Sequence, residues 1–208
     1  TLAIAPWPVL AACRGLDPVT PKVQIQTDAP PAPRIVAAAQ AEIRRRTEQA
    51  GRGASGDAVT RGLTVDELRT ETGYTLATAS LPDGSRCVAL KGIQAKVGSG
   101  GLTVLIDRRY QPGSCQYQAI LEHEQQHVRI NAEALTRTGR LMEQRLRAVA
   151  NDWAGRWVPE SEAKEIEAAV NDPGTDSVRV ARDAADAKHA QLDTPESYAA
   201  VQARCDSW

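Results

Sequence analysis

The sequence predicts an α+β fold, in which a small antiparallel β-meander packs on one long helix and a C-terminal helical lobe follows. Between residues 74 and 108, alternating apolar and polar residues are separated by turn signals. After Pro112-Gly113-Ser114 the apolar period changes from 2 to 3.6 residues. A second helical pattern covers residues 160–190. We therefore expect an extended segment at 1–33, a core at 34–153 and a helical lobe at 154–208, all within one compact domain.

The N-terminal part is rich in proline, and only residues 23–27 resemble a strand. Residues 34–50 carry an apolar stripe that predicts a helix, which the Gly-rich stretch 51–57 ends. Thr64 is followed three residues later by Glu67, a capping-box pattern that predicts a second short helix over 64–71.

Three strands are predicted at 74–80, 87–97 and 102–108. The turns between them are Pro82-Asp83-Gly84 and the Gly-rich segment 98–101, since Pro and Gly favour turn geometries. A long helix from about Cys115 to Trp153 follows, with a bend near Gly139. Asn171-Asp172-Pro173-Gly174 is expected to interrupt the next helix, and Thr194-Pro195 to begin a last one over 195–205.

The segment His123-Glu124-Gln125-Gln126-His127 is the main functional signal. Residues four apart lie on one face of a helix, so both imidazoles can bind one ion, and zinc accepts imidazole nitrogen. Glu124 is then placed to take a proton from a zinc-activated water. The opposite side of this helix carries an apolar stripe: Leu121, Val128, Ala132 and Leu135. We expect this stripe to pack on the core, so that the histidines do not lie on the main apolar face of the helix.

Catalytic zinc usually has three protein ligands. The chain has three histidines, and His189 is the one outside the motif, so we predict it as the third ligand. Glu133 stands six residues after His127, which is the position of the third ligand in metzincins. The glycine that metzincins have between these two positions is replaced here by Ile130. An acidic residue on a later helix is the remaining possibility, with Glu143, Glu160 and Glu162 as the candidates.

The four cysteines, Cys13, Cys87, Cys115 and Cys205, are widely spaced, which favours two disulfides in a periplasmic or secreted protein. We prefer the pairs Cys87–Cys115 and Cys13–Cys205; two further connectivities stay open. Leu10-Ala11-Ala12-Cys13 also resembles a lipid-attachment motif, so a lipid anchor at Cys13 is an alternative. No segment is long enough to span a bilayer. A net charge of -1 argues against nucleic-acid binding.

The stretch from Ser114 to Ile130, with its His-Glu-Gln-Gln-His core, resembles a family of uncharacterised bacterial proteins identified as secreted zinc-dependent proteases. Asp183-Ala-Ala-Asp186-Ala-Lys-His189 resembles a later element of that family, which implies His189 as a ligand. The family usually has a Gly and an aromatic residue around the second histidine, where this chain has Gln126 and Val128.

Together these features predict a zinc metallopeptidase that binds one Zn²⁺, uses Glu124 as its base and acts on a peptide or protein substrate. The peptide is expected to add to strand 102–108 as an extra strand. Tyr110 and Tyr117 are candidates for oxyanion stabilisation, or simply for packing. Two different functions are also compatible with the sequence: a non-catalytic envelope protein with a structural or vestigial zinc site, and a zinc amidase that acts on peptidoglycan.

Overall fold

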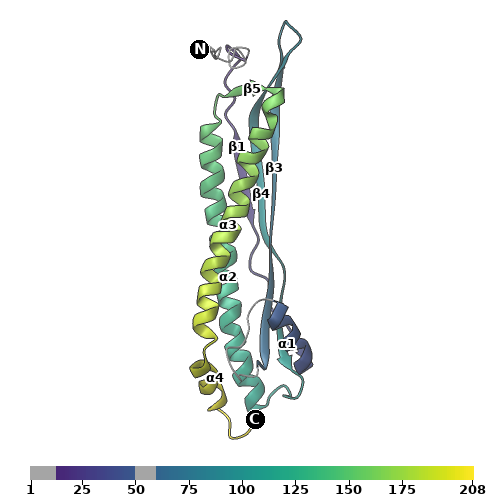
Figure 1. Ribbon diagram of the computed structural model, residues 1–208, viewed down its shortest axis with the longest axis vertical. Helices are drawn as coiled ribbons and strands as arrows, with labels where there is room; N and C mark the ends of the chain where they lie inside the picture. The colour runs from purple at the N-terminus through teal and green to yellow at the C-terminus, as the bar shows by residue number, and fades with distance from the viewer. Residues whose placement is uncertain (1–12, 50–59) are drawn as a thin grey trace, which may run out of the picture. The chain divides into compact units, whose positions relative to one another are not determined.

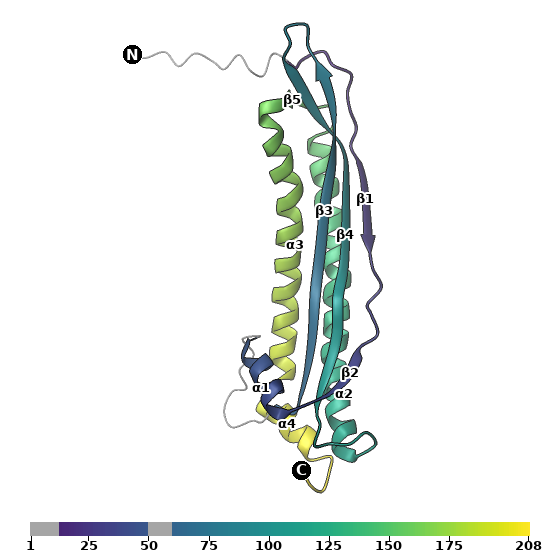
Figure 2. The same ribbon diagram turned by 90° about the vertical axis from the view of Figure 1, so that its right-hand side faces the viewer.

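The computed structural model describes residues 13–49 and 60–208 (Figures 1 and 2). Leu10-Ala11-Ala12 of the lipid-attachment motif and the Gly-rich stretch 51–57 lie outside the described residues. The strands are β1 (Lys22–Thr27), β2 (Arg34–Ala38), β3 (Gly62–Ser80), β4 (Arg86–Asp107) and β5 (Trp157–Pro159). The helices are α1 (Gln40–Gln49), α2 (Cys115–Asp152), α3 (Ala163–Leu192) and α4 (Pro195–Gln202), with a 3₁₀ turn at Glu160–Glu162.

Two compact units make up the chain. The first, here the scaffold unit, contains the chain up to Thr27 together with Thr70–Val97 and Thr138–Arg179. The second, here the site unit, contains Asp28–Arg69, Gly98–Arg137 and Val180–Trp208. The long elements β3, β4, α2 and α3 each contribute residues to both units.

In the scaffold unit, β1 pairs in parallel with residues 92–97 of β4, and β5 pairs antiparallel with residues 87–89. The largest buried side chains of this unit are apolar, among them Leu90, Ile93, Met142 and Ile166. A bond from the Arg145 guanidinium to the Ser177 hydroxyl joins the α2 and α3 portions of this unit.

In the site unit, β2 pairs in parallel with residues 103–107 of β4. Val104 and Ile106 of β4 pack on Ile120 of α2 in one apolar cluster, which fixes the helix against the sheet. A second cluster joins Leu105 to Ile43 of α1.

The predicted antiparallel meander is wrong, because the sheet is mostly parallel and the second predicted turn is part of a strand. Gly98-Ser99-Gly100-Gly101 stays extended within β4, so the two strands predicted at 87–97 and 102–108 are one. The β3 residue Asp66 accepts a hydrogen bond from the Ser99 hydroxyl, and the Arg69 and Glu67 side chains lie where a Gly100 side chain would be. Pairing with β3 thus keeps a glycine-rich segment extended.

Three helix predictions are also corrected. Residues 64–71 belong to β3, and residues 34–38 form β2, so the helix predicted at 34–50 begins only at Gln40. Both stretches contain β-branched residues and find a strand partner in β4. The predicted break at 171–174 is absent: Pro173 lies inside α3, and Gly174 leaves room there for Met142 and Thr72.

The disulfides are Cys13–Cys87 in the scaffold unit and Cys115–Cys205 in the site unit, so the preferred pairing is wrong. Sequence spacing does not reveal which cysteines the fold brings within bonding distance. Because the Cys13 sulfur is bonded to Cys87, it is not available for the alternative of lipid attachment. No helix of the described residues has the length and apolar character needed to cross a membrane.

Candidate metal centre

The inward face of α2 in the site unit is polar. One row of α2 side chains recurs at helical spacing and is buried: Ile120, His123, Glu124, His127 and Asn131. The side chains of the two histidines and Glu124 are only 4–5 % exposed. Leu121 and Val128 of the predicted apolar stripe pack on the cluster of Val104, Ile106 and Ile120, and the histidines lie on a separate polar face that is also buried. The start of β3 and the end of α3 cover this side of α2, as the contacts below show.

Three ligand atoms from His123, His127 and Asp193 converge at this face. The Nε2 atoms of the two histidines are 3.3 Å apart, and the Asp193 Oδ1 lies 3.3 Å from the first and 3.0 Å from the second. Ligands at zinc–nitrogen and zinc–oxygen distances in a tetrahedral shell are separated by about 3.3 Å. Two imidazoles and one carboxylate in this arrangement could therefore hold a metal ion.

Asp193 reaches the group because it directly follows α3. Its backbone N–H donates to the His189 carbonyl at 2.8 Å, which continues the helical pattern for one residue. Thr194 then caps α4 by accepting a bond from the Ser197 N–H, and Pro195 begins that helix. Burial would raise the pKa of Asp193, but hydrogen bonds from His123 and His127 lower it well below its ordinary value, so the group is an anion.

His189, the predicted third ligand, lies behind His127 rather than beside it. Its Nδ1 is 2.7 Å from the Nδ1 of His127, and its Nε2 is 3.1 Å from the Asn131 Oδ1. When His127 presents its Nε2 lone pair to an ion, its Nδ1 carries the proton and donates to His189, which in turn donates to Asn131. The three atoms that converge thus come from His123, His127 and Asp193, while His189 hydrogen-bonds to the ring of His127.

His123 has no comparable support in the part of the chain that the structure describes. Its Nδ1 is buried and lacks a hydrogen-bond partner. The two histidines therefore differ: the ring of His127 has hydrogen-bond partners at both nitrogens, whereas His123 has one at Nε2 alone and packs on Tyr198, with 5.4 Å between the ring centroids.

Glu124 is adjacent to the group and is held by β3. Its Oε2 accepts a hydrogen bond of 2.8 Å from the Thr64 hydroxyl, and its Oε1 lies where a side chain on Gly62 would be, 2.5 Å from an ideal Cβ. Burial raises the pKa of Glu124, against the opposing effects of His127 and Thr64. A buried carboxylate with a raised pKa is suited to accept a proton near neutral pH.

A small cavity of about 20 Å³ lies against His123 and Glu124, enough for roughly one water molecule. Its lining also includes residues of α4 and the following segment: Tyr198, Val201, Gln202 and Trp208. The Tyr198 hydroxyl donates to the Asp193 Oδ1 at 2.9 Å. Burial and the charge of Asp193 raise the pKa of Tyr198, so the phenol remains a donor.

The structure does not bring the remaining predicted candidates to this group. Glu133 is exposed and pairs with Lys188. Glu143, Glu160 and Glu162 belong to the scaffold unit, where the first two pair with Arg147 and Arg86. Tyr110 and Tyr117 pack on the apolar cluster of Val104, Ile106 and Ile120.

Asp193 and Tyr198 are not predicted from the sequence. A signal for Asp193 exists, since it stands four residues after His189 and so shares that residue's helical face. Pro195 obscures this signal, because a proline two residues later indicates a helix boundary instead.

Comparison with protein-family models, with curated proteins and with solved structures found no match to this chain.

Proposed function

We propose that the chain is a zinc-dependent hydrolase of peptide bonds. The observation that carries the proposal is the convergence of two buried imidazoles and one half-buried carboxylate beside a fourth side chain, the buried Glu124, that is not part of the group. Three protein ligands and a neighbouring carboxylate are typical of catalytic zinc, whereas structural zinc usually has four protein ligands.

In this proposal His123, His127 and Asp193 hold the ion. When bound, zinc supplies Lewis-acid polarisation of a carbonyl and acidifies water. Glu124 accepts the proton of the attacking water and delivers it to the leaving amine. Thr64 orients Glu124 through its 2.8 Å bond.

Two histidines and a carboxylate also bind iron(II) in some oxygenases. Glu124 favours hydrolysis, because a buried base one residue from a ligand has a role in water activation and none in oxygen binding.

The strand expected to pair with a bound peptide substrate changes from 102–108 to β3. Residues 102–107 of β4 lie between β2 and β3, which both pair with this strand, so a peptide cannot add there. Among the described strands, β3 pairs only with β4, and its first residue, Gly62, borders both Glu124 and the cavity. We propose that an extended peptide binds along the start of β3. The two disulfides support a periplasmic or secreted location.

The test compares the wild type and Glu124→Gln with Glu133→Gln, an exposed position on the same helix. Metal content is measured by mass spectrometry, and hydrolysis is measured on unstructured peptides and on muropeptides, in oxidising and in reducing buffer. We expect about one zinc per chain in all three proteins and at least a thousandfold loss of peptide hydrolysis in Glu124→Gln alone.

Full activity of Glu124→Gln would overturn the proposal. Cleavage of muropeptides alone would favour the amidase alternative. Bound zinc without hydrolysis of either substrate in both buffers would favour a structural site.

A further inference from the structure

The metal group is closed off by the segment that follows it. From residue 198 onwards, this segment supplies four of the nine residues that line the cavity next to His123 and Glu124, which has a volume of about 20 Å³. Pockets for ligands of ordinary size measure about 300–1,000 Å³. Among the described residues, entry of a peptide into this cavity therefore requires that residues 195–208, here called the cover, move away.

The cover is weakly packed. Its helix α4 has eight residues and none of them is buried. A helix this short is marginal without tertiary packing. Beyond α4, Trp208 packs edge-on against Tyr110, with 5.7 Å between ring centroids, and the Arg61 guanidinium lies 5.0 Å from the Trp208 ring.

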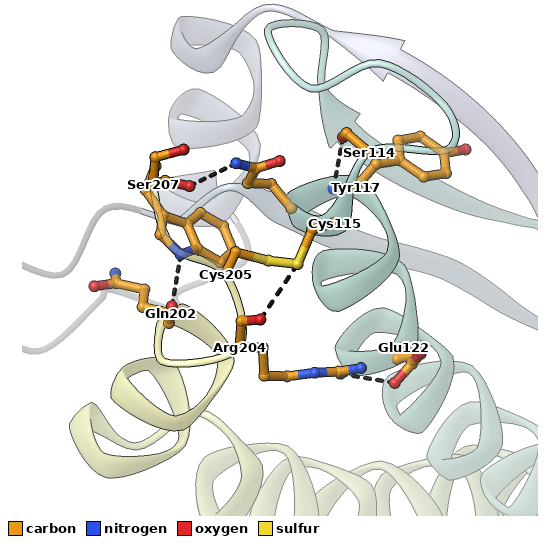
Figure 3. Close-up of a disulfide and its surroundings, with 10 residues drawn as sticks. Ser114, Cys115, Tyr117, Glu122, Gln202, Arg204, Cys205 and Ser207 are labelled. Carbon is orange, nitrogen blue, oxygen red and sulfur yellow. Dashed lines mark hydrogen bonds and ion pairs between the residues drawn. A yellow bond between two sulfur atoms is a disulfide. The ribbon is translucent and has the colours of Figure 1, made fainter.

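A disulfide holds the cover to the start of α2 (Figure 3). Around it, the Arg204 guanidinium pairs with Glu122 at 2.7 Å, and the Gln116 amide donates to the Ser207 carbonyl at 2.5 Å. The ion pair is about half exposed on both sides, so it contributes at most about 1 kcal/mol. The Cys115–Cys205 bond is thus the main restraint on a segment that buries little.

The two disulfides differ in their access to solvent. Cys13 and Cys87 are 7 % and 1 % exposed, whereas Cys115 is exposed and Cys205 half-buried. Reduction requires a thiolate to reach one sulfur of the bond. A dithiol in solution should therefore attack Cys115–Cys205 well before Cys13–Cys87.

We propose that the cover is a thiol-controlled gate: with the Cys115–Cys205 disulfide formed, the metal group is latent, and reduction of this bond opens it to substrate. A dithiol supplies two electrons and two protons. The sulfur–sulfur bond breaks to give two cysteine thiols, and the dithiol becomes a cyclic disulfide. The chain then turns at Thr194, so that Asp193 keeps its place while Tyr198 and Trp208 leave the cavity. The gate rests on the proposed function, since it controls that same site.

The test uses the zinc-loaded full chain and graded amounts of a dithiol. Mass spectrometry after alkylation identifies the reduced cysteines, a chromogenic chelator gives the rate of zinc removal, and an unstructured peptide reports hydrolysis. At a dithiol concentration that reduces Cys115–Cys205 but not Cys13–Cys87, we expect the rates of zinc removal and of peptide hydrolysis to rise at least tenfold. Zinc content after desalting should not change.

Two double variants serve as matched controls. Cys115→Ser/Cys205→Ser should be fast without reductant and insensitive to it, and Cys13→Ser/Cys87→Ser should remain latent and respond like the wild type. The gate is refuted if alkylation of Cys115 and Cys205 leaves the chelator rate unchanged, or if reduction releases the zinc into solution. Fast chelator access with no hydrolysis under any condition would instead refute the proposed hydrolase.

Discussion

The two units of the chain bury different kinds of side chain. In the described part of the scaffold unit the buried polar residues are Thr138 and Ser177, both neutral hydroxyls. The site unit buries ionisable ones: Asp107, His123, Glu124, His127 and His189. Burial of charged groups costs free energy unless they are paired or bind metal. The site unit thus carries a cost that the scaffold unit avoids, and such a cost is characteristic of a functional site.

The largest difference between the two units is expected when one buried side chain of each is truncated to alanine. His127→Ala should raise the dissociation constant for zinc at least a thousandfold, because it removes a ligand. Met142→Ala, at a fully buried apolar position, should lower the free energy of unfolding by about 2–5 kcal/mol and leave zinc affinity unchanged. Isothermal titration and urea denaturation measure the two effects. Equal zinc affinity in the two variants would show that the polar cluster is not a metal site.

The second prediction separates ligand from support within the site unit. Asp193→Ala should weaken zinc binding about a hundredfold or more, and His189→Ala about ten- to a hundredfold, because it only orients His127. Competition with a chelator of known affinity measures both. A larger loss in His189→Ala than in Asp193→Ala would restore His189 as the third ligand.

Replacing one glycine in each unit by alanine should give a smaller difference between the units. A Cβ on Gly62 would lie 2.5 Å from the Glu124 Oε1, so Gly62→Ala should displace this carboxylate and slow peptide hydrolysis by about tenfold, with zinc affinity preserved. Gly139→Ala in the scaffold unit meets Thr27 and should affect the melting temperature but not the rate per folded molecule. An unchanged rate in Gly62→Ala would mean that the position of Glu124 is unimportant.

The smallest effect concerns Asp107, a buried charge that is fully paired. Burial would raise its pKa, but hydrogen bonds from Arg109 outweigh this and lower the pKa below the ordinary 3.8. Its ionised form therefore stabilises the fold above that pH, and the contribution disappears as the pH falls through the lowered value. Asp107→Asn should cost about 1–2 kcal/mol at pH 7, and progressively less below pH 3.8, in urea denaturation. A difference that does not depend on pH would exclude the charge as its cause.

Local signals in the sequence predict some features well. The strand at residues 23–27 and the helix after Thr194-Pro195 are both found, because alternation and capping depend on neighbouring residues only. The segment 98–101 is predicted as a turn but is extended, since its conformation depends on pairing with the neighbouring strand β3. The disulfide pairs and Asp193 escape prediction for the same reason: both depend on which distant segments the fold brings together.

The three histidines have a practical consequence. The chain contains only three, and all of them lie in one connected group, with His123 next to His127 and His127 next to His189. Every imidazole resonance in an NMR spectrum of this protein therefore comes from the same few ångströms of its interior. Ring nitrogen shifts recorded on the intact chain would report which nitrogen of each ring holds a proton or an ion, with no further histidine to obscure them.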